Sequence, residues 1–172
     1  RVWLNLTNTQ GAFKQILVGY VTGATNEYDS SYDGYSFSLN EYIDFYSFLG
    51  TDAMAIQGRA LPFNDSDVVP LGYRSTIAGD FSISIDEVDG TMQEQNLFLE
   101  DKTQNVIHNL KESPYTFTTE AGTFDNRFVL RYTDKTLGNT DFEGVNSSVV
   151  ISKDKKELKI KSELETIKRV TI

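Results

Sequence analysis

The sequence predicts an all-β protein, built as an antiparallel β-sandwich or jelly roll. Residues 97–133 alternate apolar and polar side chains with the two-residue period of half-buried strands, as in Phe128 and Leu130 against Arg127 and Arg131. Tyr and Phe, which favour strands, occur 9 and 11 times. Turn-forming residues recur roughly every 8–12 positions, which is the spacing that sandwiches and jelly rolls produce.

Strands are expected wherever apolar residues alternate or cluster between turn signals. Residues 42–48 also fit a helical stripe, but their aromatic and β-branched content favours a strand. Residues 97–133 contain four short apolar runs, which cannot close a core alone and need covering strands. About ten strands are therefore expected before Thr133, and no segment favours a helix. The remaining expected strands are residues 2–6, 13–21, 53–58 and 81–85.

Two polar stretches are expected to be loops. Residues 23–34 hold too many small and polar side chains for a strand, and residues 64–70 form a polar run that ends at Pro70. Asp89 and Gly90 form a dipeptide typical of a tight turn.

The composition excludes several classes of function. The formal charge is -9, and an acidic surface repels phosphate, so nucleic acid is not expected as a partner. Cys is absent, which excludes disulfides and thiolate metal sites. No apolar run approaches about 18 residues, so the chain is not expected to span a membrane.

Charge and composition change after Thr133, which predicts two parts. Residues 1–133 form the expected β-sandwich domain, residues 134–144 read as a linker, and residues 145–172 form a second part. The first 144 residues carry a net charge of -12 and the remaining 28 carry +3. The strand pattern at both ends suggests that the chain begins inside a larger polypeptide and that its last module continues beyond Ile172.

No set of side chains forms a recognisable catalytic site, so the chain is not expected to be an enzyme. His108 is the only histidine, and its strand-like context favours a structural role over a catalytic one. A Ser-His-Asp triad would need a nucleophile elbow, which the sequence lacks. A zinc site would need more His or Cys, and Gly-rich phosphate loops are absent.

The first loop offers the leading candidate cofactor site, for calcium, and a second acidic loop at residues 64–67 is a weaker one. Glu27, Asp29 and Asp33 are hard oxygen ligands, and Gly34 permits a sharp turn. Their spacing differs from an EF-hand, and Asx turns explain the same residues. Tyrosines of this loop, with Trp3 and Tyr35, could also stack on a glycan, although aromatic residues of β proteins more often pack in the core.

Arginines on the expected strands suggest ion pairing rather than ligand binding. The surplus of carboxylates makes such pairs more plausible than a bound anion. The residues concerned are Arg59, Arg74, Arg127 and Arg131.

Residues 1–133 carry an ordered series of motifs that resembles a known family. The chain resembles the β-sandwich region near the C-terminus of large Bacteroidetes surface proteins that the type IX secretion system exports. The matching motifs are WLNL (3–6), QGAFKQILVGY (10–20), GAT (23–25), YDSSYDG (28–34), IQGRALPF (56–63), PLGY (70–73), FLEDK (98–102), HNL (108–110), YTF (115–117) and RFVLRY (127–132).

The tail is similar to the first strands of the small β-sandwich that forms the C-terminal sorting domain of that system. In that family a further hairpin and a Lys-rich strand follow. The matching runs are VVIS (149–152), KKELKIKS (155–162) and IKRVTI (167–172).

The resemblance implies export rather than catalysis. The family's sorting domain is recognised by the outer-membrane translocon and its shuttle protein, and a sortase-like peptidase then removes it and attaches the cargo to the cell surface. The expected location is therefore secreted or at the cell surface, reached through the periplasm. The alternative function is a calcium-dependent carbohydrate-binding or adhesive β-sandwich module, with glycans as partners.

A basic stripe on the tail has two interpretations. It is either a solvated strand edge that discourages pairing between copies, or a docking surface for the translocon. It consists of Lys153, Lys155, Lys156, Lys159 and Lys161.

Overall fold

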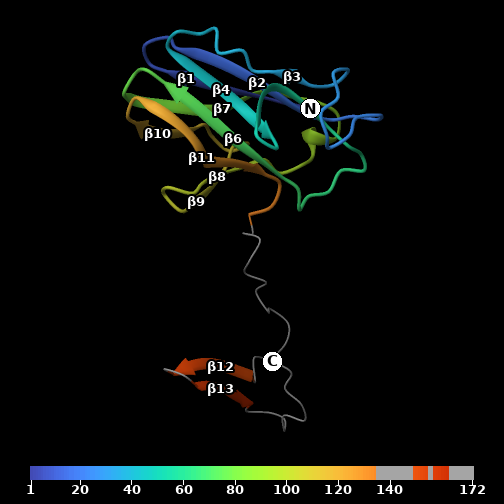
Figure 1. Cartoon of the computed structure of the whole chain (residues 1–172), viewed down its shortest axis with the longest axis vertical. Helices are drawn as coiled ribbons and strands as arrows, with labels where there is room; N and C mark the ends of the chain where they lie inside the picture. Colours follow the sequence, from blue (N-terminus) through green and yellow to red (C-terminus); the bar gives the residue numbers. More distant parts are fainter. Residues whose placement is uncertain (135–148, 155–156, 163–172) are drawn as a thin grey trace. The chain divides into compact units, whose positions relative to one another are not determined.

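The computed structural model describes residues 1–134, 149–154 and 157–162, and the chain divides into two compact units, Arg1–Lys135 and Thr136–Ile172. The first unit is nearly all β, with one short 3₁₀ helix, η1 (Gly90–Gln93), among its described residues (Figure 1). The prediction of an all-β, sandwich-like fold is confirmed. No helix in the described part of the chain is long and apolar enough to cross a membrane.

The first unit contains eleven strands, and most of them lie where the alternating pattern predicted them. The four runs of residues 97–133 are the last four strands of the sheet, β8 to β11. The strands are β1 (Val2–Asn8), β2 (Phe13–Tyr20), β3 (Gly34–Tyr35), β4 (Ile43–Leu49), β5 (Asp52–Arg59), β6 (Val68–Ser75), β7 (Gly79–Val88), β8 (Phe98–Asp101), β9 (Val106–Asn109), β10 (Tyr115–Thr119) and β11 (Gly122–Arg131).

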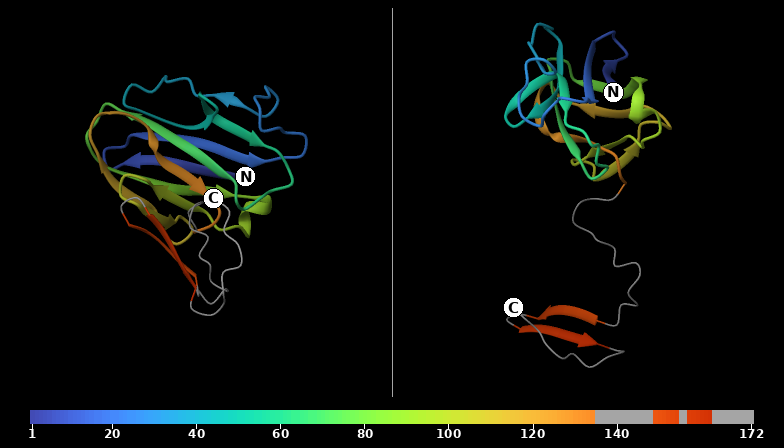
Figure 2. Two further views of the ribbon diagram at one scale, coloured as in Figure 1. Left: turned by 60° about the horizontal axis from the view of Figure 1, so that its bottom comes forward. Right: turned by 90° about the vertical axis from the view of Figure 1, so that its right-hand side faces the viewer.

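These strands form one sheet in the order β10-β7-β1-β2-β5-β4-β6-β11-β8-β9, with β3 paired to β5. The sheet curls over on itself, so that its two halves face each other across the core (Figure 2). All pairs are antiparallel except β2 and β5, which run parallel with Leu17 opposite Ile56. The predicted antiparallel architecture therefore holds with this single exception in the described sheet.

The core lies inside the curl and draws on both halves of the sheet. Leu4 of β1 and Ile83 of β7 face it from one half, and Phe45 of β4, Tyr73 of β6 and Phe128 of β11 face it from the other. Their relative exposures are 1% or less. Each apolar side chain of this size stabilises the fold by roughly 1.5–3 kcal/mol when it leaves water.

The loop predicted for residues 64–70 is wrong at its end, because β6 begins at Val68 and contains Pro70. Proline lacks an N–H and normally excludes a central strand. Pro70 lies opposite Val129 of β11, whereas pairing of β6 with β4 ends at Leu71. One side of β6 therefore has no β4 partner at Pro70, and the missing N–H is tolerated there.

The second unit contains a two-stranded antiparallel sheet. Its strands are β12 (Val149–Asp154) and β13 (Glu157–Ser162), with Val149 opposite Ser162 and Asp154 opposite Glu157. Strand β13 matches the predicted run of residues 157–162, and β12 overlaps the predicted run of residues 148–152 but extends two residues beyond it. The third expected strand, residues 167–172, lies outside the described residues.

Close packing at Gly72 gives a test of the fold. A Cβ at Gly72 would overlap the Tyr46 ring and lie 2.8 Å from Cε2 of Phe48, so Gly72→Ala should lower the free energy of unfolding by about 1–3 kcal/mol. Gly34→Ala is the matched control, because its Cβ would meet Ile56 at an ordinary 3.6 Å. Urea denaturation measures both, and equal stability of the two variants would contradict the packing described.

Candidate functional site

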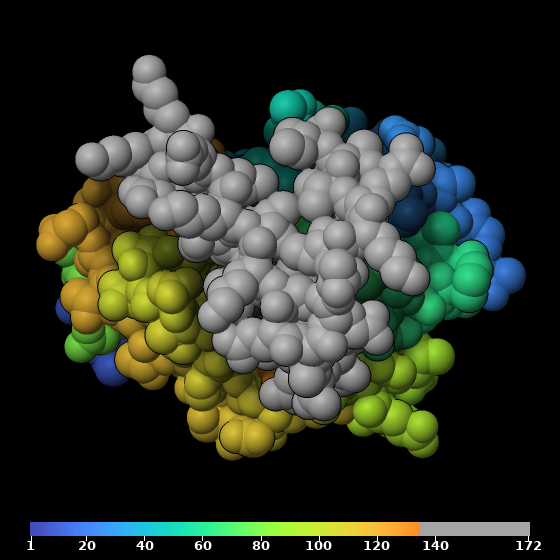
Figure 3. All heavy atoms as spheres, turned by 90° about the horizontal axis from the view of Figure 1, so that it is seen from below, coloured from blue at the N-terminus to red at the C-terminus, as the bar shows by residue number. Residues whose placement is uncertain are grey.

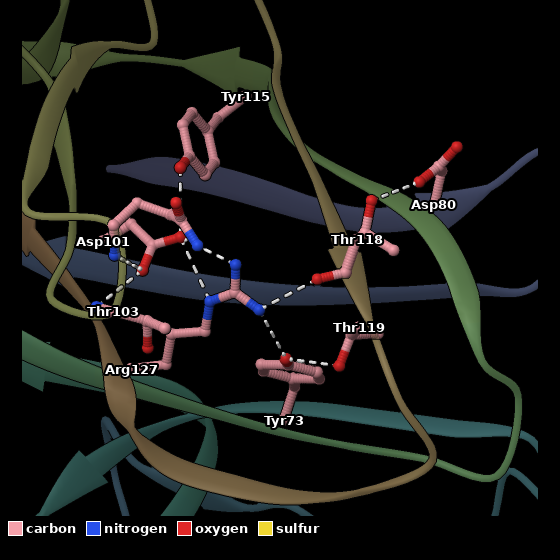
Figure 4. Close-up of polar contacts among 9 residues, drawn as sticks. Tyr73, Asp80, Asp101, Thr103, Tyr115, Thr118, Thr119 and Arg127 are labelled. Atoms are coloured by element: carbon pink, nitrogen blue, oxygen red, sulfur yellow. Dashed lines mark hydrogen bonds and ion pairs between the residues drawn. The ribbon is translucent and has the colours of Figure 1, made fainter.

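A buried polar cluster lies where the two ends of the curled sheet approach each other. Strand β10 pairs only with β7, and β9 pairs only with β8, so no backbone ladder joins these two edges. Side chains from β6, β8, β10 and β11 meet in the space between them (Figure 4). We call this group the seam cluster; its members are Tyr73, Asp101, Tyr115, Thr118, Thr119 and Arg127.

An irregularity in β11 places the central arginine of the cluster. Phe124 lies opposite Tyr73 and Phe128 lies opposite Leu71, so β11 advances four residues where β6 advances two. Such a bulge re-aims the side chains of the strand that carries it. The backbone carbonyl of Arg127 accepts a hydrogen bond from the Lys102 amide at 2.9 Å, which holds the bulge against the end of β8.

Arg127 contacts three different strands through its guanidinium. Nε and Nη2 donate to Oδ2 of Asp101 at 3.1 and 2.8 Å. Nη1 donates to the Tyr73 hydroxyl at 3.3 Å and to the Thr118 carbonyl at 3.2 Å. The guanidinium carbon also lies 4.6 Å from the ring centre of Phe117, a favourable cation–π distance. These contacts tie β11 to β6, β8 and β10.

Asp101 is fully buried and its carboxylate is fully engaged. Oδ1 accepts the Thr103 and Gln104 amides at 2.9 and 3.2 Å, and Oδ2 accepts the Tyr115 hydroxyl at 3.0 Å in addition to Arg127. Burial by itself raises the pKa of Asp101, but these hydrogen bonds and the charge of Arg127 outweigh it, so the pKa is lowered. Burial and the hydrogen bond to Asp101 raise the pKa of Tyr115 to about 12.

The chemistry of the seam cluster suits a structural role, in which it holds the strands together, better than catalysis. A general acid or base needs a proton that it can exchange near neutral pH. Asp101 stays ionised and Tyr115 stays protonated at neutral pH, because their pKa values move away from 7. Every oxygen of Asp101 already accepts a hydrogen bond from the protein.

A cleft of about 470 Å³ adjoins the cluster between the edges of β9 and β10. Arg127 and Tyr115 line its inner side, while Gln104 and Val106 line the side of β9. In the space-filling view the yellow atoms near residues 100–110, which include β9, lie together on one side of the surface (Figure 3). Three members of the cluster, Tyr115, Thr118 and Arg127, therefore line an accessible cleft.

His108 lies in β9, within a strand as its sequence context indicated. Its Nε2 lies 2.8 Å from the Ser113 carbonyl and 3.2 Å from the Ser113 hydroxyl, and its ring packs 5.4 Å from Tyr115. Among the described residues no carboxylate is bonded to the imidazole. The histidine therefore braces the turn between β9 and β10.

The proposed calcium ligands lie in the first loop, where the protein backbone already uses two of the three. Oδ2 of Asp33 accepts the Asp29 amide at 2.7 Å, and Oδ1 accepts the buried Gly58 amide at 2.8 Å. Asp29 accepts the Ser31 amide at 2.8 Å, which is an Asx turn. No group of three or more metal-ligating side chains occurs in the described part of the chain. Glu27 is exposed and does not converge with the other two.

The lysines of the predicted docking surface lie in the second unit. Lys153 is in β12, and Lys159 and Lys161 are in β13. Lys155 and Lys156 lie outside the described residues, as do the side chains of the other three. The translocon-docking role of these lysines stays a prediction.

The predicted pairing of arginines with carboxylates is confirmed for three of the four residues. Arg127 pairs with Asp101 at 2.8 Å. Arg74 is the exception, because it donates to the Ser38 hydroxyl and the Asn40 carbonyl. The other two pairs are Arg59 with Asp67 at 2.7 Å and Arg131 with Glu100 at 2.8 Å.

Sequence reasoning did not select Asp101, Tyr115 or Tyr73. The one local signal was the run from Asp101 to Gln104, in which an aspartate followed by polar residues after an apolar strand favours an Asx-type turn. The meeting of these residues depends on strand order, which the local pattern does not carry.

The fold and the seam cluster define a β-sandwich-like domain whose curled sheet is closed by side chains. Comparison with family models assigns it: residues 1–132 match the family described as Domain of unknown function (DUF8693), and the chain belongs to that family. Neither curated proteins nor solved structures gave a match.

Breaking the central ion pair should destabilise the domain. Asp101→Asn leaves Arg127 buried without its counter-charge, so we expect a loss of about 3–5 kcal/mol in the free energy of unfolding at pH 7. Because folding lowers the pKa of Asp101, its contribution is complete above the unfolded value of about 4 and is lost as the pH falls through the folded value. The difference between parent and variant should therefore narrow below about pH 4.

Chemical denaturation at several pH values measures this effect. Asp65→Asn, at an exposed loop position, is the matched control and should leave stability unchanged at pH 7. A stability of Asp101→Asn equal to that of the parent at pH 7 would show that the ion pair does not hold the seam.

Asp33 should act as a structural brace of the first loop. Asp33→Ala removes the acceptor of the buried Gly58 amide, and we expect a loss of about 1–3 kcal/mol in the free energy of unfolding. Glu27→Ala, at an exposed position, should change little. Measuring the parent with calcium and with EDTA completes the test, since a calcium-dependent rise in Tm would instead assign these carboxylates to a metal.

Proposed function

We propose that the chain is a non-enzymatic C-terminal region of an exported cell-surface protein, which targets that protein for type IX secretion and surface attachment. In this proposal residues 1–133 are a folded domain between the cargo and the signal. Residues 145–172 are the first strands of the sorting domain that the translocon, its shuttle protein and the sortase-like peptidase recognise.

The observation that carries the proposal is the second compact unit with its antiparallel β12–β13 sheet. It follows a folded domain whose family match ends at residue 132, and it begins at Thr136. The charge changes sign over the same part of the chain, from -12 in the first 144 residues to +3 in the remainder. A second compact unit with a basic C-terminal part is well suited to recognition that does not involve the acidic domain before it.

Two properties of the first unit also support a role without bond chemistry. Two of its buried carboxylates form ion pairs, Asp101 with Arg127 and Asp44 with Lys14, which holds them in their charged form. Its motifs occur in the order found in the secreted surface proteins that it resembles. A folded domain with a packed apolar core is a suitable spacer between a cargo and its signal.

Export of a reporter tests the proposal. We would fuse a secreted reporter to residues 1–172 extended to the natural end of the reading frame, and to residues 1–135 alone, in a type IX-competent host. We expect only the first fusion to be displayed on the surface or released. In a host whose translocon is deleted, the first fusion should be neither displayed nor released. Periplasmic retention of the complete fusion, or equal export of both fusions, would refute the proposal.

A lysine variant sharpens the same experiment. Changing the lysines of β12 and β13 to Gln should reduce export if the basic stripe docks on the translocon. Lys102→Gln, at an exposed position of the first unit, is the matched charge control and should export normally. Unchanged export after loss of the stripe would assign it to a solvated edge.

A further inference from the structure

Two hollows on the surface of the first unit share a wall formed by Asp80 and Thr116. One is the cleft of about 470 Å³ between the edges of β9 and β10. The other, of about 220 Å³, lies beside the end of β1 and includes Thr7 and Ser82. Because both are lined by Asp80 and Thr116, they are direct neighbours, and we call the two together the Asp80 cleft.

The strand register brings hydroxyl groups into a row along this cleft. Thr116 of β10 lies opposite Ser82 of β7, and Ser82 lies opposite Thr7 of β1. Neighbouring strands are about 4.8 Å apart, so three hydroxyl side chains repeat at that spacing. The alternate residues Phe81 and Phe117 point into the core, which leaves the outward face to polar groups.

Most of the residues that line the cleft carry hydrogen-bonding side chains, although apolar atoms also contribute to its surface. Asn8 and Gln104 add amides, and Asp80 adds a carboxylate whose Oδ1 accepts the Thr118 hydroxyl at 2.6 Å. Beyond the two core phenylalanines, Val106 is the only aliphatic side chain that lines the two hollows. The hydroxyl-bearing side chains are Thr7, Thr9, Ser82, Tyr115, Thr116 and Thr118.

The free edge of β10 supplies further hydrogen-bonding capacity. Strand β10 pairs only with β7, so its other edge faces the cleft. The Thr118 carbonyl on that edge accepts Arg127 at 3.2 Å, and the Thr118 side chain is held by Asp80. The cleft wall is thus fixed before any ligand arrives, which lowers the entropic cost of binding.

This chemistry selects among classes of ligand. A phosphate-bearing ligand would meet the negative charge of Asp80 and a net charge of -12 in the first 144 residues, and Arg127 is already neutralised by Asp101. An apolar ligand would leave the hydroxyl and amide groups without partners. A neutral molecule with many hydroxyls avoids the charge repulsion and gives the hydroxyl and amide groups hydrogen-bond partners. The larger hollow has the volume of a small-ligand site.

We propose that the Asp80 cleft binds a neutral oligosaccharide. The sugar hydroxyls bond to Asp80, Thr116 and Ser82, and Gln104 and the free edge of β10 complete the site. The site lies in the first unit and uses neither the calcium candidates Glu27, Asp29 and Asp33 nor the basic stripe. It is therefore independent of the proposed role in export.

Calorimetric titration of the whole chain with neutral hexasaccharides of glucose, mannose, xylose and N-acetylglucosamine, followed by a broad glycan array, tests the proposal. We expect at least one neutral glycan to bind with a Kd in the micromolar to millimolar range. Thr116→Val and Asp80→Asn should each weaken that binding about fivefold or more, because each removes or weakens a hydrogen bond to the sugar.

Matched controls separate the cleft from the rest of the surface. Thr123→Val and Asp65→Asn change an exposed threonine and an exposed aspartate outside the cleft, and both should bind as the parent does. Asn at position 80 still accepts the Thr118 hydroxyl, so the fold should persist, and the Tm of each variant verifies this. Amide shifts on titration should map to Thr7, Ser82 and Thr116.

Three outcomes overturn the proposal. The first is an absence of glycan binding in both assays, and the second is glycan binding that the two cleft variants leave unchanged. The third is that extended peptides from a library bind at the edge of β10 while no saccharide binds. The last would assign the cleft to strand addition instead.

Discussion

The hydrogen-bonded pair of Asp101 and Arg127 is the interaction on which closure of the sheet depends. A sheet that curls over on itself leaves two edges, and here β9 and β10 are not joined by a backbone ladder. The approach of the two ends is held by side chains, with Arg127 donating to groups of β6, β8 and β10. Without this pair the apolar residues behind it, such as Phe117 and Phe128, would lose their cover.

A buried ion pair is a costly way to add stability, because desolvation offsets much of the attraction between the charges. The role of the Asp101–Arg127 pair in this protein is better explained by its effect on the register in which β11 pairs with its neighbours. Arg127 lies within the bulge of β11, and its acceptors lie on three different strands. A slip of β11 by one residue would point the guanidinium to the other face and leave Asp101 buried without a counter-charge. The pair therefore favours one strand alignment over its neighbours.

The sequence allowed the strands to be located but not the order in which they pair. Aromatic and β-branched content identified β4 despite its helical stripe, because the strand preference of a side chain is a local property. Pairing is not local: β10 and β11 are separated only by Glu120 and Ala121, yet β10 pairs with β7 and β11 pairs with β6 and β8. The chain order favours a hairpin there, and Arg127 and Tyr73 occupy the space that the hairpin ladder would fill. For the same reason Asp101 and Tyr115 could not be assigned to a site in advance.

The position of β10 links the structural cluster to the surface beside it. Its inward residue Phe117 packs in the core, and its outward residues Thr116 and Thr118 line the cleft. Thr118 is held twice, through its carbonyl by Arg127 and through its hydroxyl by Asp80. An edge strand held in this way keeps its remaining polar groups in fixed positions, whereas a strand free to shift would have to be ordered on binding. The ion pair that closes the sheet thereby also helps to fix the outer surface of β10, the surface on which the proposed glycan site lies.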